Sequence, residues 1–412
     1  MKTKRAGLVS LSILLAAGVA AALFCWRPAI APAQPPALAS FPPETVVAGA
    51  RLAALGDCAT CHAGTNGQAY AGGGALRTPF GVIHATNITP DPETGIGGWT
   101  LAAFRRAMID GVARDGSHLY PAFPYPHFAG MGDDDIASLY AFFMTRPPVH
   151  APAPPNELRF PFGLRPLLAG WKALFLPARP FCPDPSRRDA WNRGAYLVKT
   201  IGHCGACHTP RNALGAEQRK AVLAGGQAEG WDAPALNGAS TAPVPWTEAQ
   251  LFTYLRTGFE PHHGGAAGPM APVITELAAV PDADLHAIAT YIASFMPSAG
   301  PPVAHAAGHP SAQATALFAG ACATCHDAGA PGPTAPLALS TSLAAAQPTD
   351  AARILLAGLQ PPAGRSGAFM PGFADALTDE QLSGLLVYLR EEVAGRPGWT
   401  DIAATLHEAR QE

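Results

Sequence analysis

The clearest pattern along the chain is a helical spacing of hydrophobic residues that occurs three times. Each copy begins at an aspartate, and apolar or aromatic residues follow three, six, nine and ten positions later. The aspartates are Asp133, Asp282 and Asp379. This spacing puts the apolar residues on one face of a helix, and a carboxylate suits the positive end of the helix dipole. The pattern predicts three related helices, each closing a domain and packing on the first helix of that domain.

Two further helices repeat along the chain. An amphipathic first helix is expected in each repeat, at residues 44–56, 191–202 and 311–320. A middle helix is expected twice, because two threonines that follow tryptophans lie eleven residues before a glycine and suit the N-cap position. These are Thr100 before Gly111 and Thr247 before Gly258, and the third repeat lacks the Trp-Thr pair. The repeat predicts three small helical domains in tandem.

The first helix of each repeat runs into the same pentapeptide, Cys-x-x-Cys-His. Its copies are Cys58, Cys61 and His62; Cys204, Cys207 and His208; and Cys322, Cys325 and His326. Two thiols at this spacing add across the vinyl groups of a haem, and the adjoining imidazole is the proximal ligand of the iron. A zinc ribbon needs a second ligand pair, and a thioredoxin-like site needs a βαβ context. Neither is visible, so three covalently bound haem c groups (Fe) and electron transfer are expected.

These repeats predict the fold class: all-α, three tandem class I cytochrome c domains, each a small helical bundle around a covalently bound haem. The expected domains are residues 40–150, 186–298 and 308–395, with a Pro-rich apolar linker at 151–185. Charged residues form only 14% of the chain, and Gly and Pro number 43 each. This composition suits loop-rich domains whose cores are completed by haem. A net charge of −3 argues against a nucleic acid partner.

The N-terminus has the features of an export signal. Three basic residues among the first five precede an apolar stretch at 6–26, and Ala-Pro-Ala at 31–33 fits a signal-peptidase site. Residues 1–33 are predicted to be a signal peptide or an N-terminal anchor, since the stretch is long enough to span a bilayer; cleavage is favoured. The protein is expected to be exported to the periplasmic side of the bacterial inner membrane, with membrane association.

A second apolar segment, residues 160–182, lies between the first two domains. It is rich in Leu, Phe and Trp but short and interrupted by Pro, so a membrane span is not expected. Three roles stay open: docking a partner, lying on the membrane surface, or covering the interface between the first two domains, with the last as the default.

A methionine sulfur usually binds the iron of such a haem opposite the histidine, and it raises the reduction potential relative to ligation by two histidines. Met270 lies twelve residues before Asp282, and Met370 lies nine before Asp379. Both are therefore expected in the loop before a closing helix. They are predicted to be the sixth ligands of the second and third haems.

The first domain departs from this pattern. The matching position, ten residues before Asp133, is Phe123, whose side chain cannot bind iron. His127 lies in the same loop with a competent imidazole and ranks first as the sixth ligand. Met131, two residues before Asp133, ranks second because it needs a different loop path. An open, five-coordinate first haem ranks third.

Four segments around the motifs resemble the three-haem cytochrome c subunit of bacterial membrane-bound dehydrogenases. They are residues 86–91 (Thr-Asn-Ile-Thr-Pro-Asp), 118–125 (His-Leu-Tyr-Pro-Ala-Phe-Pro-Tyr), 191–198 (Trp-Asn-Arg-Gly-Ala-Tyr-Leu-Val) and 202–212 (Gly-His-Cys-Gly-Ala-Cys-His-Thr-Pro-Arg-Asn). The resemblance implies that the chain takes electrons from a large catalytic subunit and passes them to ubiquinone or a terminal oxidase. A small iron-sulfur or accessory subunit is a further expected partner.

The catalytic partner differs between branches of that family. It is a quinoprotein alcohol dehydrogenase, a flavin dehydrogenase of gluconate or another sugar acid, or a molybdenum hydroxylase of aldehydes or N-heterocycles such as nicotinate. Phe123 and residues 369–377 are most similar to the molybdenum branch. The alcohol dehydrogenase branch resembles the other two repeats in having a methionine at the position of Phe123, so the resemblance does not supply the first haem's ligand.

A non-catalytic relay is the leading hypothesis for the function. The sequence shows no dinucleotide-binding glycine pattern, phosphate-binding loop or nucleophile elbow, so it does not indicate hydride or acyl transfer. Two alternatives remain: a peroxidase-type haem enzyme that uses an open first haem, and a free electron shuttle without a stable partner. The low charge content favours a permanent partner, because lasting interfaces are largely hydrophobic.

Overall fold

The computed structural model describes residues 2–64, 67–176, 180–298, 311–327, 336–361 and 369–411. The chain divides into two compact units, Met1–Ala53 with Cys58–Cys182, and Ala54–Asp57 with Pro183–Glu412. The first unit contains the first Cys-x-x-Cys-His motif, and the second contains the other two. Among the described helices, none combines the length and apolar character needed to cross a membrane.

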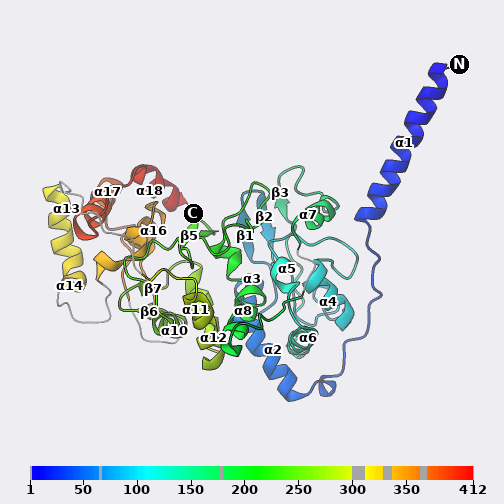
Figure 1. Ribbon diagram of the computed structural model, residues 1–412, viewed down its shortest axis with the longest axis horizontal. Coiled ribbons are helices and arrows are strands. Elements are labelled where there is room, and N and C mark those ends of the chain that lie inside the picture. Colours follow the sequence, from blue (N-terminus) through cyan, green and yellow to red (C-terminus); the bar gives the residue numbers. More distant parts are fainter. Residues whose placement is uncertain are drawn as a thin grey trace. The chain divides into compact units, whose positions relative to one another are not determined.

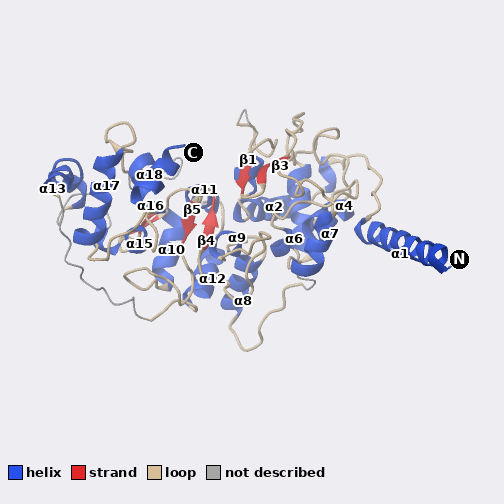
Figure 2. Ribbon diagram, turned by 90° about the horizontal axis from the view of Figure 1, so that it is seen from above, coloured by secondary structure: helices blue, strands red, loops and turns tan. Residues whose placement is uncertain are grey.

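The described part of the first unit consists mainly of helices and also contains a small three-stranded sheet (Figures 1 and 2). The helices are α1 (Lys2–Cys25), α2 (Pro43–Leu55), α3 (Cys58–His62), α4 (Leu101–Asp110), α5 (Tyr125–Phe128), α6 (Asp133–Met144) and α7 (Leu167–Phe175), with a 3-10 turn at Leu38–Ser40. The strands pair antiparallel in the order β1 (Ala75–Thr78), β2 (Gly81–His84) and β3 (Glu157–Leu158). Because β3 lies within the predicted linker 151–185, part of that linker completes the sheet of the first domain.

The second unit begins with a domain that repeats this plan. Its helices are α8 (Asp189–Lys199), α9 (Gly205–His208), α10 (Glu248–Thr257), α11 (Met270–Leu277) and α12 (Asp282–Ala293). Two short hairpins join them, β4 (Gly226–Ala228) with β5 (Trp231–Ala233) and β6 (Phe259–Glu260) with β7 (Gly264–Gly265). The fold is helical, as predicted, but the sequence did not predict these hairpins.

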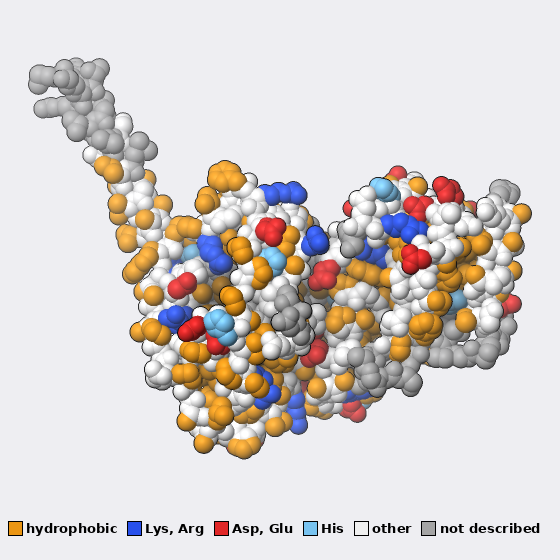
Figure 3. Space-filling view, turned by 180° about the vertical axis from the view of Figure 1, so that it is seen from behind, with side chains coloured by type: hydrophobic (Ala, Val, Ile, Leu, Met, Phe, Trp, Pro, Cys, Tyr) orange, Lys and Arg blue, Asp and Glu red, His pale blue; other side chains and the backbone are white. Residues whose placement is uncertain are grey.

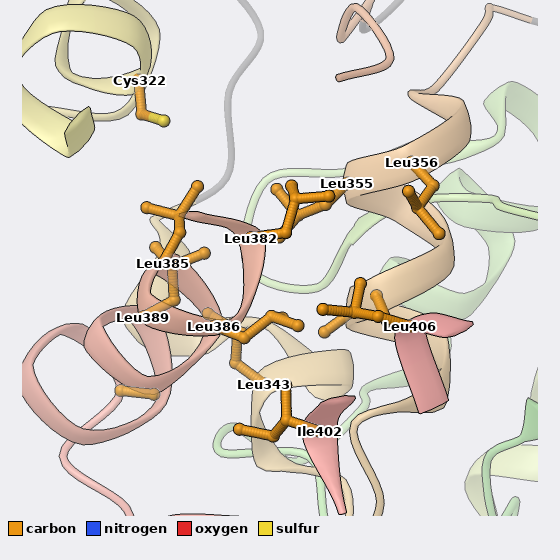
Figure 4. Packing of buried hydrophobic residues seen from close by; sticks show 13 residues of the cluster. Cys322, Leu343, Leu355, Leu356, Leu382, Leu385, Leu386, Leu389, Ile402 and Leu406 are labelled. Atoms are coloured by element: carbon orange, nitrogen blue, oxygen red, sulfur yellow. The ribbon is translucent and has the colours of Figure 1, made fainter. Parts of the chain in front are cut away.

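The rest of the second unit forms the third helical domain. Its elements are α13 (Ala312–Leu317), a π-helical turn (Phe318–Cys322), α14 (Ala323–His326), a 3-10 turn (Leu337–Leu339), α15 (Thr341–Ala344), α16 (Thr349–Ala357), α17 (Asp379–Tyr388), a second π-helical turn (Leu389–Val393) and α18 (Ile402–Gln411). Leucines of α16 and α17 meet Ile402 and Leu406 of α18 in one buried cluster (Figure 4). The core of this domain therefore continues beyond residue 395, where the sequence analysis ended it.

The three closing helices begin at the predicted aspartates, α6 at Asp133, α12 at Asp282 and α17 at Asp379. The residues at the first predicted apolar offset are fully buried: Ile136, Leu285 and Leu382. The aromatic residues also pack on the first helical segment, as predicted for Tyr291 and Tyr388. Their ring centroids lie 5.0 Å from Trp191 and 5.1 Å from Phe318.

Glycines let the first and last helices of a domain cross closely, which the sequence analysis did not anticipate. A Cβ atom at Gly49 of α2 would lie 1.9 Å from the carbonyl oxygen of Ser138 in α6. A Cβ atom at Gly194 of α8 would lie at the same distance, 1.9 Å, from the carbonyl oxygen of Ala287 in α12. Ser138 and Ala287 each stand five residues after the closing aspartate, so both crossings use the same position.

The predicted caps of the middle helices are confirmed. Thr100 accepts a hydrogen bond from the Ala103 amide, and Thr247 forms a capping box with Gln250. Gly111 and Gly258 end the helices with φ values of 58° and 78°, which favour glycine. The third domain also has a middle helix, α16, without the Trp-Thr pair.

Candidate haem-binding sites

His62, at the end of α3, is the first of the motif histidines. Its Nδ1 atom lies 2.6 Å from the carbonyl oxygen of Thr86. The hairpin β1–β2 brings Thr86 back to the motif, because the chain reverses at Gly81 and returns toward the histidine. The imidazole therefore donates its Nδ1 proton to the backbone, and its Nε2 atom keeps the electron pair that binds a metal.

His208, at the end of α9, has the same arrangement. Its Nδ1 atom lies 2.7 Å from the carbonyl oxygen of Pro234, directly after β5. The hairpin β4–β5 thus plays the part that β1–β2 plays in the first domain. Burial lowers the pKa of His62 and of His208, and the hydrogen bonds to the carbonyls partly oppose this.

Two glycines make this anchoring possible. A Cβ atom at Gly74 would lie 2.7 Å from the carbonyl oxygen of Cys61, and one at Gly226 would lie 2.3 Å from that of Cys207. Neither position has room for a side chain, because real Cβ contacts below 3.0 Å are essentially absent. Glycine therefore lets each hairpin lie directly against its Cys-x-x-Cys-His motif.

Residues 86–91, which carried part of the family resemblance, hold the Thr86 carbonyl in place beside His62. Asn87 is only 2% exposed, and its side-chain amide donates to Thr94 Oγ1 and to the Val149 carbonyl. Its Oδ1 atom accepts from both the amide and the hydroxyl of Thr89, each at 2.8 Å. This network fixes the backbone next to Thr86 and so fixes the carbonyl that holds His62.

The third motif has the same helical form but a different environment. His326 ends α14, Cys322 is buried and Cys325 is exposed. The Nδ1 atom of His326 is buried and has no hydrogen-bond partner among the described residues. Burial lowers the pKa of His326 and raises that of the Cys322 thiol.

The candidate sixth ligands lie in different local structures. Met270 is the first residue of α11 and is partly buried, so it begins a helix and does not lie in an open loop. Met370 pairs with Leu359 in a β-bridge and packs against the core of the third domain. His127 lies in the short helix α5 and is partly buried, whereas Met131 is 2% exposed.

Hydrogen-bond register relates the ligand regions of the first two domains. The Leu119 amide donates to the Gly111 carbonyl at 2.8 Å, and the Ala266 amide donates to the Gly258 carbonyl at 2.8 Å. Leu119 is therefore equivalent to Ala266. Phe123 and Met270, each four residues further on, occupy equivalent positions, as the sequence analysis predicted.

The pair His262 and His263 lies in the turn between β6 and β7. His263 stacks on Trp246 with ring centroids 3.5 Å apart, and both its ring nitrogens are buried without a hydrogen-bond partner. Burial lowers the pKa of His263 to about 4. Among the described residues, no group of three or more His, Cys, Asp or Glu side chains is placed to hold a metal ion.

Comparison with protein families defines the class of the protein. A cytochrome c model matches residues 46–147 and 192–295, and a model of subunit III of cbb3-type cytochrome c oxidase matches residues 310–389. The anchored imidazoles fit the proximal side of a haem, since each presents Nε2 beside two cysteines. The chain is a c-type cytochrome, which binds haem c covalently.

Comparison with individual proteins defines the family more narrowly. The chain is 46% identical over 409 residues to a nicotinate dehydrogenase subunit of Pseudomonas putida, covering 96% of this chain but only 34% of that protein. It is 38% identical over 396 residues to the fructose dehydrogenase cytochrome subunit of Gluconobacter japonicus, covering 87% of this chain and 81% of the relative. It is 35% identical over 377 residues to the gluconate 2-dehydrogenase cytochrome c subunit of Pantoea cypripedii, covering 83% and 84%.

The chain therefore belongs to the family of cytochrome c subunits of dehydrogenases, which are electron-transfer subunits. It spans about a third of the length of the nicotinate dehydrogenase subunit and most of the length of the other two relatives. The family resemblance found in the sequence is confirmed.

Proposed function

We propose that this chain is the three-haem electron relay of a dehydrogenase complex. One haem c is assigned to each motif, held by thioether bonds and a proximal histidine: Cys58, Cys61 and His62; Cys204, Cys207 and His208; Cys322, Cys325 and His326. Each haem supplies one-electron chemistry, because its iron alternates between Fe(II) and Fe(III). The three domains each hold one of these groups: the first at about 40–150, the second at 186–298, and the third from about 308 through α18 (Ile402–Gln411).

The observation that carries this proposal is the anchoring of His62 and His208. Each imidazole is fixed by a backbone carbonyl, at 2.6 Å and 2.7 Å, on a hairpin packed against the motif. A hydrogen bond from the second ring nitrogen orients a histidine ligand and raises its basicity. A ligand that cannot move suits an electron relay, because little structural rearrangement accompanies each change of charge.

Met270 and Met370 are proposed as the sixth ligands of the second and third haems, and His127 as that of the first. Phe123 takes the position of Met270 in the hydrogen-bond register, so the first haem needs a ligand from elsewhere. Met131 ranks after His127 as a candidate ligand. It stands two residues before its closing helix, and the residue at that position in the second domain is Val280, which cannot bind iron. Both residues are buried, at 2% and 3% exposed, which suits apolar packing at this position.

The proposed electron donor is a large molybdenum hydroxylase subunit, with a quinoprotein or flavin dehydrogenase as the next choices. The 46% identity to the nicotinate dehydrogenase subunit, against 38% to the fructose dehydrogenase cytochrome subunit, supports this order. The proposed acceptor is the quinone pool or a terminal oxidase, and a small iron-sulfur or accessory subunit is a further partner. Figure 3 shows a face on which hydrophobic side chains far outnumber charged ones, which suits a lasting interface.

The proposed location is the periplasmic side of the bacterial inner membrane. The basic start, the apolar stretch and the Ala-Pro-Ala sequence at 31–33 support export.

The test is affinity purification of the tagged protein from its native membranes in mild detergent. Mass spectrometry of the co-purifying chains, metal analysis and the haem-to-protein ratio are measured together. A stoichiometric molybdenum subunit and three haems per chain are expected. A lone cytochrome would refute the partner, and a flavin or quinone subunit would refute the molybdenum assignment while keeping the relay.

The ligand of the first haem is tested by spectroscopy of the His127→Ala and Met131→Ala variants. Loss of the low-spin signal of one haem is expected in His127→Ala alone. If neither variant changes that haem, both residues are excluded as ligands.

A further inference from the structure

The described residues of the apolar segment 160–182 contact the first domain, and the proposed relay gives this segment no role. Its helix α7 and the turn before it contact residues 118–125, the segment that includes Phe123. Further along, the Phe181 amide donates to the Gly130 carbonyl at 3.1 Å. The segment therefore touches the described chain on both sides of His127, the proposed sixth ligand of the first haem.

Lys172 of α7 makes the most specific of these contacts. The residue is 8% exposed, and its ammonium group donates to the carbonyls of Asp110 and Gly111 at the end of α4 and to His118 Nδ1, which lies 3.0 Å away. An ammonium group has three donors, and each of them has an acceptor here. The C-terminal carbonyls of a helix also favour a cation. A lysine in an otherwise apolar helix is thus fully satisfied.

Arg165, in the turn before α7, binds the same segment from another direction. Its Nη1 atom donates to the His118 carbonyl at 2.8 Å, and its guanidinium lies 4.9 Å from the ring centroid of Tyr120. The Tyr120 hydroxyl donates to the Gly163 carbonyl at 3.2 Å. The ring of Trp171 meets that of Tyr125, a fully buried residue, edge to face at 6.2 Å. Both ends of the segment 118–125 are therefore fixed by the insert.

Residues 160–176 pack on the segment in which the first domain differs from the second. Phe123 stands in the position that Met270 takes in the second domain, so this position of segment 118–125 supplies no iron ligand. A methionine bound to iron restrains its own loop, whereas a phenylalanine leaves that restraint to packing and hydrogen bonds. The insert provides both.

We propose that residues 160–176 position the sixth-coordination side of the first haem, with Lys172 and Arg165 holding residues 118–125 so that the protein's own ligand stays bound and external ligands stay out. The inference rests on the proposed function, because it requires a haem at Cys58, Cys61 and His62. Lys172 and Arg165 are positioning residues and do not bind the iron. The described part of this segment is thereby assigned a role at the first haem.

The test uses the full-length holoprotein, reduced, with carbon monoxide as the probe and the low-spin signals of the oxidised haems as a second readout. Lys172→Met keeps most of the length and apolar stem of the side chain but removes all three donors. We expect it to bind carbon monoxide at one haem, faster than the wild type does, and to change one low-spin signal. Lys172→Arg keeps the charge but replaces three convergent donors by a planar group, so a smaller change is expected.

Lys220→Met is the matched control, since Lys220 is exposed in the second domain. It should leave carbon monoxide binding and all haem signals unchanged. Arg165→Met tests the second contact at a site less buried than Lys172, and it keeps the proposal testable if Lys172→Met incorporates haem poorly. The proposal is overturned if Lys172→Arg and Arg165→Met, with full haem content, match the control in both readouts.

The haem content of the wild type separates this proposal from the proposed function. Fewer than three haems per chain would overturn the function itself. If the wild type already binds carbon monoxide at one haem, His127 is excluded as a ligand. Faster binding in the variants would then still show that residues 160–176 restrict access to that haem.

Discussion

The glycine crossing in the second domain leads to a quantitative prediction for Gly194→Ala. The added Cβ atom would lie 1.9 Å from the carbonyl oxygen of Ala287, 2.6 Å from its carbon and 2.8 Å from Tyr291 Cβ. Two of these three atoms are backbone, so no side-chain rotation relieves the overlap. Helices α8 and α12 must move apart by about an ångström or more before normal contacts of this kind return.

The size of the effect follows from two opposing contributions. Overpacking a rigid core costs about 1–3 kcal/mol, and a backbone obstacle places this case near the upper end. Replacing glycine by alanine inside a helix gains about 1 kcal/mol. The net loss is about 2 kcal/mol in the free energy of unfolding, which corresponds to a fall of roughly 8 °C or more in the apparent Tm of a small domain.

The assay is thermal unfolding of the holoprotein, followed by helical circular dichroism and by haem absorbance. Gly170→Ala in α7 is the matched control, because a Cβ atom there has no neighbour within 4 Å. That variant should gain about 0.5–1 kcal/mol from helix propensity alone. If Gly194→Ala stabilises the protein as Gly170→Ala does, the close crossing of α8 and α12 is wrong.

Three further predictions concern the second unit. Leu382→Ala should cost about 2–5 kcal/mol in urea unfolding, because Leu382 is fully buried in the third-domain core, and an unchanged midpoint would contradict that packing. Thr247→Ala should cost about 1 kcal/mol through loss of the capping box, whereas Thr247→Ser should keep most of it. Burial raises the pKa of Asp350 to about 6, so its contribution to stability is complete at acidic pH below the unfolded pKa and is lost as the pH rises through about 6. Unfolding midpoints of the wild type should therefore fall across that window relative to Asp350→Asn, and parallel curves would refute the shift.

The closing helices and two middle helices were predictable because they depend on residues close together in the chain. The starts of α6, α12 and α17 follow from an aspartate and a fixed apolar spacing, and the caps at Thr100 and Thr247 follow from a Trp-Thr pair eleven residues before a glycine. Local signals of this kind repeat in each domain, so one copy supports the next.

The anchors of those histidines were not predictable in the same way. Strands of three or four residues, such as β1 and β4, carry too few positions for an alternating pattern to stand out. What places them is the close approach of Gly74 and Gly226 to the motif backbone, a contact between residues more than ten positions apart. In the sequence these glycines look like ordinary loop residues, since the chain has 43 glycines of mixed role.

The contacts of the apolar segment 160–182 were also not predictable from the sequence. Its composition indicated an apolar surface needing cover, and the sequence left a partner, the membrane and a domain interface as open alternatives. Lys172, the one basic residue of α7, shows which face of this helix packs on the first domain, because a buried ammonium group needs acceptors for its donors. Those acceptors are Asp110, Gly111 and His118, which lie more than fifty residues earlier in the chain. A charged residue within an apolar helix is thus a signal for a specific long-range contact, and here it directs the insert to the one haem domain whose methionine position holds a phenylalanine.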